Sequence, residues 1–140
     1  KFVAVSNFFL SKPIGYRNQP NFINAVICIK STLTSLKLLK ILLEIENQCG
    51  RKRSFKNAPR SIDLDLLIFK SLKVQLKGPP KLIIPHPQMH RRAFVLKPLI
   101  EIDPNCIIPG LGQASIKLKN CHSQKIECFK QKPLVDLINN

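Results

Sequence analysis

The sequence predicts one domain that combines helices and strands, as either an α+β or an α/β sandwich. Short segments rich in Val, Ile and Phe alternate with one strongly periodic helical segment, in the order strand, strand, helix, strand. The chain of 140 residues is long enough to bury one core. No internal repeat or low-complexity linker divides it, so we assign residues 1–140 to a single domain.

The first half of the chain predicts two strands and a helix. Residues 2–10 (FVAVSNFFL) and 22–30 (FINAVICIK) are rich in β-branched and aromatic residues and predict an antiparallel pair of strands. Residues 11–20 contain two prolines and a glycine and predict a loop. In the helical segment, Thr34 suits the N-cap and Gly50 suits the C′ position. Its apolar face contains Leu36, Leu39 and Leu43.

The second half predicts shorter elements. A basic loop, 51–60, precedes a strand at 61–69 (SIDLDLLIF). Two short strands, 74–76 and 81–85, flank a Gly-Pro-Pro turn. Residues 86–104 predict short helices or turns, broken at Pro87 and Pro98. Weaker patterns indicate a strand at 125–129 and a helix at 133–140.

The charge balance is strongly basic. Twenty-three Lys and Arg residues oppose eight Asp and Glu residues, giving a net charge of +15. Such a charge attracts nucleic acid, an anionic membrane or a nucleotide polyphosphate, and composition alone does not choose among them. The chain has no signal-peptide pattern and no apolar run long enough to cross a membrane.

The five cysteines form neither a disulfide framework nor a zinc motif, because no C-x-x-C pair occurs. Free thiols are typical of a reducing compartment, so we expect a cytoplasmic protein. The cysteines are Cys28, Cys49, Cys106, Cys121 and Cys128.

Two aspartates interrupt the apolar stretch 61–69. Side chains alternate in a strand, so Asp63 and Asp65 would share one face, with Cα atoms about 6.5–7 Å apart. Ile62, Leu64 and Leu66 would occupy the opposite face and anchor the strand in the core. Paired carboxylates on one face suit Mg²⁺ bound to a substrate phosphate. The alternative is a pair of salt bridges to the arginines of the preceding loop, Arg51, Arg53 and Arg60.

Basic residues cluster on both sides of this stretch. Before it lie Arg51, Arg53, Lys56 and Arg60, which could neutralise the charge of a transferring polyphosphate. After it, PHPQMHRRAF (85–94) contains a second cluster, His86, His90, Arg91 and Arg92, followed by Phe94. A solvated charged surface is the simpler explanation for the scattered lysines elsewhere.

A flat heterocycle could bind at the predicted strand 22–30. Phe22 and Asn24 would share one face and place an aromatic plane beside an amide, which suits stacking and edge recognition. The alternative is that Phe22 belongs only to the core.

Three motifs in order resemble the 6-hydroxymethyl-7,8-dihydropterin pyrophosphokinases, the bacterial type in particular. They are NQPNFINAV (18–26), NAPRSIDLDLL (57–67) and IPHPQMHRRAFVLKPLIEIDP (84–104). The resemblance implies a ferredoxin-like α+β sandwich with a mainly antiparallel sheet. It also implies ATP- and Mg²⁺-dependent transfer of pyrophosphate to the pterin hydroxymethyl group, with release of AMP, in folate biosynthesis. We therefore expect a monomeric enzyme of small-molecule substrates, without nucleic-acid or membrane partners.

The resemblance also implies roles for individual residues. Asp63 and Asp65 would hold two Mg²⁺ ions, and Arg51, Arg60 and Arg92 would assist catalysis. The ATP site would contain Glu46, Arg53, Arg60, Leu66, Lys81, His86 and Arg92. The pterin site would contain Ser11, Lys12, Ile14, Phe22, Asn24 and Phe94.

The sequence departs from the family pattern in several places. Family members open with a strand and a helix that this chain lacks, so we expect an N-terminally truncated fold whose independent folding and activity need testing. Lys12, Asn57 and Lys81 replace residues that are common at these positions in relatives. An inactive relic of the enzyme and a basic nucleic-acid-binding domain are the alternative interpretations.

Overall fold

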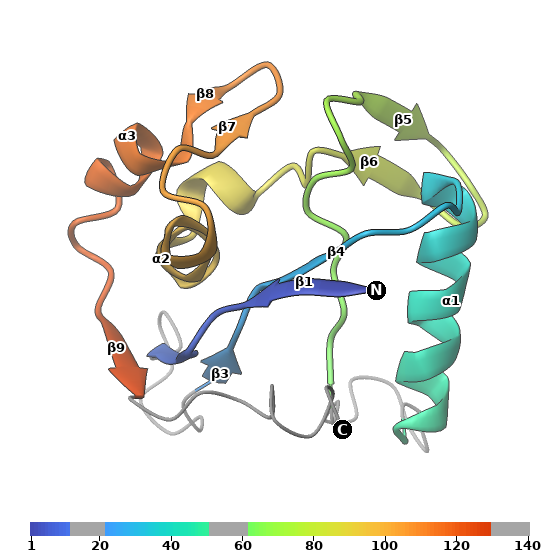
Figure 1. The fold of residues 1–140 in the computed structure, drawn as a ribbon, viewed down its shortest axis with the longest axis horizontal. Coiled ribbons are helices and arrows are strands. Elements are labelled where there is room, and N and C mark those ends of the chain that lie inside the picture. The colour runs from blue at the N-terminus through green and yellow to red at the C-terminus, as the bar shows by residue number, and fades with distance from the viewer. Residues whose placement is uncertain (12–21, 51–61, 130–140) are drawn as a thin grey trace. The chain divides into compact units, whose positions relative to one another are not determined.

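The computed structural model describes residues 1–11, 22–50 and 62–129 (Figure 1). The chain divides into two compact units, residues 1–31 with 88–140 and residues 32–87. Helices are mixed with strands, and every strand pair in the described ranges is antiparallel, which confirms the α+β class. The sequence-predicted helix at 133–140 lies outside the described residues.

The first unit begins with a bent antiparallel hairpin. Strand β1 (Phe2–Val5) pairs with β4 (Ile27–Ile29), and β2 (Phe8–Ser11) pairs with β3 (Phe22–Asn24). The antiparallel pairing of the first two segments is thus confirmed, but each predicted strand is split in two.

Ser6 causes the split in the first strand. Its backbone N–H donates to Val26 O at 2.9 Å, and its hydroxyl accepts from the Val26 N–H, also at 2.9 Å. The Asn7 N–H donates to Glu101 Oε1 at 2.7 Å, so it leaves the ladder. A fully buried side chain therefore replaces a backbone partner at the bend.

The remainder of this unit packs around helix α2 (Ala93–Ile102). A short 3₁₀ helix, η1 (Met89–Arg91), precedes α2, and α3 (Ala114–Lys119) packs against both. Helix α2 also contacts β2, and its Leu96 is fully buried. Strand β9 (Ile126–Phe129) pairs with β2 on the side opposite β3, which confirms the strand predicted at 125–129.

Two features of this region were not predicted correctly. The predicted break at Pro98 is wrong, because α2 continues through this buried proline. The loss of one N–H donor is outweighed by burial of the apolar helix face against α3 and β2. The hairpin of β7 (Ile107–Ile108) and β8 (Gly112–Gln113), and α3 after it, had no clear sequence signal.

The second unit contains α1 (Ser35–Gln48) and a hairpin of β5 (Val74–Leu76) and β6 (Leu82–Ile84). The Thr34 side chain accepts from the Lys37 N–H at 3.3 Å, and Gly50 has φ of 93°, so both predicted caps are confirmed. The two short strands predicted around the Gly-Pro-Pro turn are also confirmed. Ile84 and Leu82 are nearly inaccessible to solvent.

The strand predicted at 61–69 is wrong for its described part, residues 62–69, which form no strand. The segment is rich in residues that favour strands, but a strand also needs a neighbouring strand with which to form hydrogen bonds. Among the described residues, backbone hydrogen bonds of the segment run from His86 N–H to Leu67 O at 2.8 Å and from Leu72 N–H to Phe69 O at 3.1 Å. Neither continues into a ladder.

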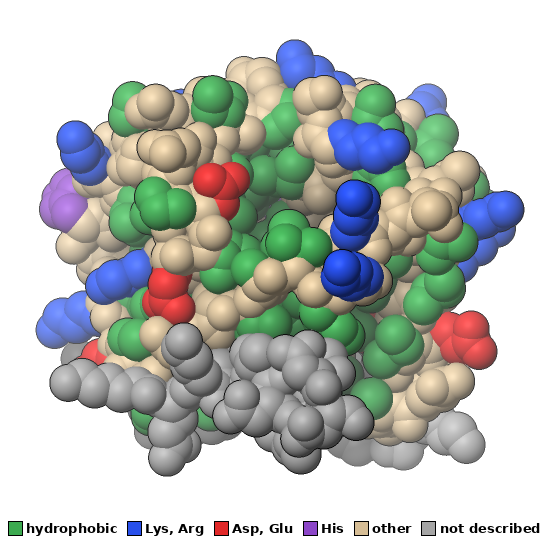
Figure 2. All heavy atoms as spheres, in the orientation of Figure 1, with side chains coloured by type: hydrophobic (Ala, Val, Ile, Leu, Met, Phe, Trp, Pro, Cys, Tyr) green, Lys and Arg blue, Asp and Glu red, His purple; other side chains and the backbone are tan. Residues whose placement is uncertain are grey.

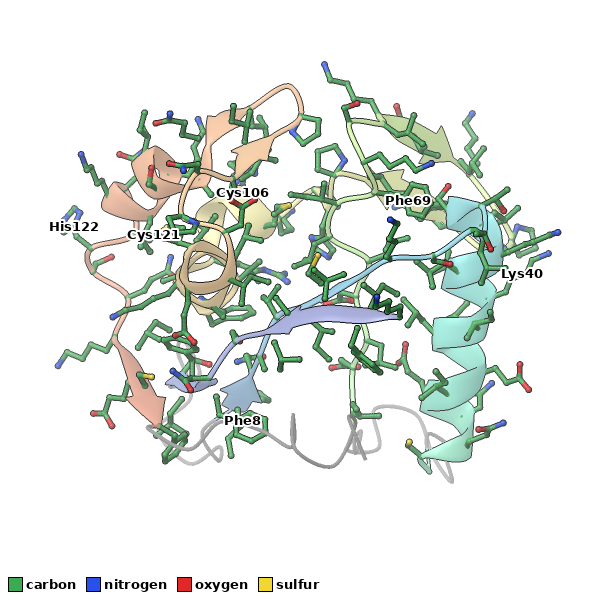
Figure 3. All side chains as sticks on the ribbon, in the orientation of Figure 1. Phe8, Lys40, Phe69, Cys106, Cys121 and His122 are labelled. Atoms are coloured by element: carbon green, nitrogen blue, oxygen red, sulfur yellow. The ribbon has the colours of Figure 1, made fainter. Side chains whose placement is uncertain are left out.

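Lys and Arg side chains are spread over the visible face of the described residues, with few acidic ones among them (Figure 2). No helix in the described ranges has both the length and the apolar composition needed to span a membrane. The five cysteines are free thiols. Cys106 and Cys121 are buried in the first unit (Figure 3), whereas Cys28, Cys49 and Cys128 are exposed.

Candidate functional site

Six of the sequence-predicted site residues lie outside the described ranges. These are Lys12, Ile14, Arg51, Arg53, Lys56 and Arg60. The others divide between the two units, and each group is described separately.

In the first unit, the β2–β3 pairing brings three candidate pterin residues together. Ser11 is the register partner of Phe22, and Phe9 is the partner of Asn24. The Asn24 Nδ2 group donates to the Ser11 hydroxyl at 3.2 Å, which orients the amide. Ser11 is only 6% exposed, whereas Phe22 is 54% exposed. The pairing thus presents an open aromatic ring next to an oriented amide.

The exposure of Phe22 answers one question that the sequence left open. A core phenylalanine would have little accessible surface, but this ring is among the most exposed large apolar side chains in the described residues. The ring is therefore accessible to a stacking partner.

The start of α2 presents a cation and a second aromatic ring. Arg92 occupies the N-cap position, and Phe94 lies in the first turn. The Arg92 guanidinium lies over the Phe94 ring, with Cζ 5.5 Å from the ring centroid. Both side chains are partly buried. The proposed sandwich of a pterin between Phe22 and Phe94 stays a prediction.

Two interactions near this turn were not predicted from the sequence. Arg91 Nε donates to His90 Nε2 at 3.2 Å, so His90 uses one ring nitrogen as an acceptor. Gln124, which lies 31 residues beyond Ala93, accepts from the Ala93 N–H at 2.8 Å. A lone glutamine in a polar stretch carries no sequence signal for such a role.

In the second unit, the two aspartates retain the alternation expected of an extended segment. Asp63 and Asp65 are exposed, whereas Leu64 and Leu66 are half-buried. Ile62 is 38% exposed, so its predicted place in the core is wrong. The leucines therefore hold the segment while both carboxylates face solvent.

These carboxylates fit the chemistry of a magnesium site. Mg²⁺ takes one or two protein carboxylates and completes its octahedron with water and substrate phosphate oxygens. Among the described residues, no group of three or more His, Cys, Asp and Glu side chains is arranged to hold a metal by itself. A site of this kind would depend on phosphate for its remaining ligands. The arginines of the salt-bridge alternative lie outside the described ranges.

His86 is tied to the same segment. Its backbone N–H donates to Leu67 O at 2.8 Å, two residues after Asp65. Lys81 is exposed and immediately precedes β6. The carboxylate segment, an imidazole and an ammonium group thus belong to one compact unit.

Glu46 differs from the other candidates in this unit. It lies in the last turn of α1 and is only 3% exposed. Burial of an unpaired carboxylate is costly, and Glu46 is not without an interaction. Its expected proximity to a nucleotide stays a prediction.

Comparison with known proteins supports the family resemblance. Residues 1–104 match the family model described as 7,8-dihydro-6-hydroxymethylpterin-pyrophosphokinase. The chain is 42% identical over 108 residues to a 2-amino-4-hydroxy-6-hydroxymethyldihydropteridine pyrophosphokinase of Haemophilus influenzae, covering 77% of this chain and 66% of that protein.

Proteins of the same name from two further bacteria are also similar. The Pseudomonas aeruginosa protein is 39% identical over 127 residues, which are 91% of this chain and 76% of the relative. The Bacillus subtilis protein is 41% identical over 98 residues, which are 70% of this chain and 57% of the relative. The chain thus spans between about half and three quarters of these relatives. The matches confirm that this chain belongs to the 7,8-dihydro-6-hydroxymethylpterin-pyrophosphokinase family.

Proposed function

We propose that this chain transfers the terminal pyrophosphate of ATP to the hydroxymethyl group of 6-hydroxymethyl-7,8-dihydropterin and releases AMP, as a step of folate biosynthesis. Membership in the family supports the reaction class. The observation that carries the proposal is the pair of exposed carboxylates, Asp63 and Asp65, held by half-buried leucines in the matched region.

In this proposal, Asp63 and Asp65 hold Mg²⁺, which neutralises charge on the ATP phosphates when it is bound. Cationic side chains bind the remaining phosphate oxygens and orient the polyphosphate for in-line attack. These cationic residues are Arg51, Arg53, Arg60, Lys81 and Arg92, and the His86 imidazole binds beside them. Leu66 and Glu46 complete the proposed nucleotide site.

The pterin is recognised by stacking and by hydrogen bonds. Phe22 and Phe94 provide aromatic faces, and the amide of Asn24, oriented by Ser11, reads the edge of the ring. Lys12 and Ile14 would contribute from the hairpin loop. Phosphoryl transfer needs little covalent help from protein, so these residues act mainly by positioning the hydroxymethyl oxygen.

We further propose that residues 1–140 act as one domain with a ferredoxin-like arrangement, and that the protein is a cytoplasmic monomer. The antiparallel ladder β3-β2-β9 and helix α2 packed against β2 support the ferredoxin-like arrangement. Sedimentation measurements test the monomeric state.

The direct test is AMP release by the 140-residue chain supplied with ATP, Mg²⁺ and the reduced hydroxymethylpterin. The expected result is AMP that depends on the pterin, disappears with EDTA and is lost in Asp65→Asn. AMP formation without pterin would contradict the transfer. A cooperatively folded chain that forms no AMP would identify an inactive relic, and tight, salt-dependent oligonucleotide binding by that chain would favour the nucleic-acid alternative.

A further inference from the structure

The N-terminus of α2 lacks a cap from its own N-cap residue. Arg92 makes no side-chain capping hydrogen bond, and its guanidinium lies over the Phe94 ring. The first N–H groups of a helix have no partner within the helix and need one from elsewhere. The Ala93 N–H finds it in Gln124 Oε1, at 2.8 Å.

The same Gln124 amide makes a second bond on the other side of Arg92. Gln124 Nε2 donates to Arg91 O at 2.7 Å. One side chain therefore binds both peptide groups that flank Arg92. Asparagine and glutamine amides can do this because they carry a donor and an acceptor on one rigid plane.

The backbone of Arg92 itself is also fully bonded. Its N–H donates to Met89 O at 3.3 Å, and its carbonyl accepts from the N–H groups of Val95 and Leu96, each at 3.0 Å. With the two Gln124 bonds, every backbone polar group from Arg91 O to the Ala93 N–H has a partner. Arg92 is held in an extended conformation, with φ of −115° and ψ of 106°, between two helical segments.

Residues before and after Gln124 in the chain fix its position. Its own N–H donates to the carbonyl of the buried Cys121 at 3.0 Å. Two residues later, Ile126 pairs with Ser11 in the β2–β9 ladder. Gln124 therefore connects the start of α2 to the strand that carries Ser11.

We propose that Gln124 is a positioning residue for Arg92. By fixing both flanking peptide groups, it sets the direction in which the Arg92 side chain leaves the backbone. This inference rests on the proposed function, because it takes the ATP phosphates as the ligand of Arg92. Gln124 lies outside residues 1–104, which the family model matches.

The variant Gln124→Met tests the two bonds, because it removes both while retaining most of the side-chain volume. Gln113→Met is the matched control, since Gln113 is exposed and its side chain makes no hydrogen bond in the described part of the chain. Loss of one hydrogen bond predicts about 5- to 10-fold faster amide exchange at Ala93, measured by NMR. Gln124→Glu retains an acceptor for the Ala93 N–H but replaces the donor to Arg91 O by a second acceptor, so it tests the bond to Arg91 separately.

Binding of α,β-methylene-ATP with Mg²⁺, measured by calorimetry, then tests the positioning role in a double-mutant cycle. We expect Arg92→Ala to weaken binding about 10- to 100-fold and Gln124→Met about 3- to 10-fold. In the Arg92→Ala background, Gln124→Met should add less than about twofold. A merely structural glutamine would weaken binding equally in both backgrounds, which would overturn the inference.

Two further outcomes separate this inference from the proposed function. A coupled cycle in a chain that makes no pterin-dependent AMP would support the positioning role and contradict the transfer. Normal AMP release with an uncoupled cycle, or unchanged nucleotide affinity despite faster exchange at Ala93, would overturn the role of Gln124 and leave the transfer standing.

Discussion

The guanidinium of Arg92 covers the ring of Phe94, with Cζ 5.5 Å from the ring centroid. The contact joins a residue proposed for the ATP phosphates to one proposed for the pterin, at the first turn of α2. A planar cation over an aromatic face contributes on the order of 0.5–1 kcal/mol at a partly exposed site and restricts both side chains. A change in the position of Arg92 or Phe94 would therefore affect both the proposed ATP site and the proposed pterin site.

Replacing Arg92 by lysine tests this dependence. Lysine retains the charge but loses the planar contact with Phe94 and bidentate binding of phosphate oxygens. We expect Arg92→Lys to lower kcat/KM about 10- to 100-fold while changing the free energy of unfolding by less than about 1 kcal/mol. Steady-state kinetics and urea unfolding measure the two quantities.

Arg91→Lys is the matched control, because Arg91 is the exposed neighbour of Arg92. Its side chain bonds to His90 and not to Phe94. An equal loss of kcat/KM in both variants would show that the effect of lysine is not specific to Arg92 and its contact with Phe94.

Asp65→Asn tests the carboxylate segment. If this exposed carboxylate binds Mg²⁺, the variant should lose at least about 10³-fold in kcat, because charge neutralisation at the phosphates is a main source of catalysis. In metal-free buffer the melting temperature should be unchanged or slightly higher, since the substitution removes repulsion between Asp63 and Asp65. Thermal unfolding with and without EDTA measures this effect.

Glu127→Gln, in exposed position on β9, is the control for loss of one surface negative charge. A clear fall in the melting temperature of Asp65→Asn alone, in metal-free buffer, would favour the salt-bridge alternative over the metal site.

Ser11→Ala tests the orientation of the Asn24 amide. The variant removes the hydroxyl that accepts from Asn24 Nδ2 at 3.2 Å. We expect about 3- to 10-fold weaker pterin binding and little change in binding of the ATP analogue, measured by calorimetry.

Ser6→Ala provides a contrast in the same hairpin. The buried Ser6 hydroxyl accepts from the Val26 N–H and donates to Asn7 O, so both of its bonds are to residues not proposed to bind the pterin. Its loss should cost about 1–3 kcal/mol of unfolding free energy, because it leaves a buried donor without a partner, with no selective effect on pterin binding. Parallel losses of pterin affinity in both variants would argue against a specific role for Ser11.

The buried thiols predict a pH dependence of stability. Burial raises the pKa of the Cys106 thiol above its ordinary value, and the nearby Asp103 carboxylate raises it further; burial alone raises the pKa of Cys121. The folded state therefore keeps protons that the unfolded chain releases. This contribution to the free energy of unfolding is complete below the ordinary thiol pKa, about 8.5, and declines as pH rises above it.

Urea unfolding between pH 7.5 and pH 9.5 measures this decline, and Cys106→Ala should make it shallower. Alkylation by iodoacetamide at pH 8 measures independently which thiols are buried. Cys28, Cys49 and Cys128 should react quickly, whereas Cys106 and Cys121 should react only as the protein opens. Rapid modification of all five thiols in the folded protein would contradict the assigned burial.

Short-range chemistry was predictable from the sequence because it depends on neighbours in the chain. The Thr34 and Gly50 caps and the alternation of Asp63 and Asp65 with leucines follow from side chains within a few positions. The family motifs are also short stretches of neighbouring residues, and the family assigned from them is confirmed.

The distant partners of backbone groups were not predictable from local patterns. In the folded chain, residues 62–69 form no strand, and the first hairpin bends at Ser6. The Gln124 side chain bonds the peptide groups on both sides of Arg92. The physical reason is that a buried N–H or C=O group must be satisfied by whatever segment reaches it, and a local pattern does not specify that segment. Local sequence patterns thus predict which side chains carry the proposed chemistry, whereas the orientation of Arg92 and Asn24 depends on the fold.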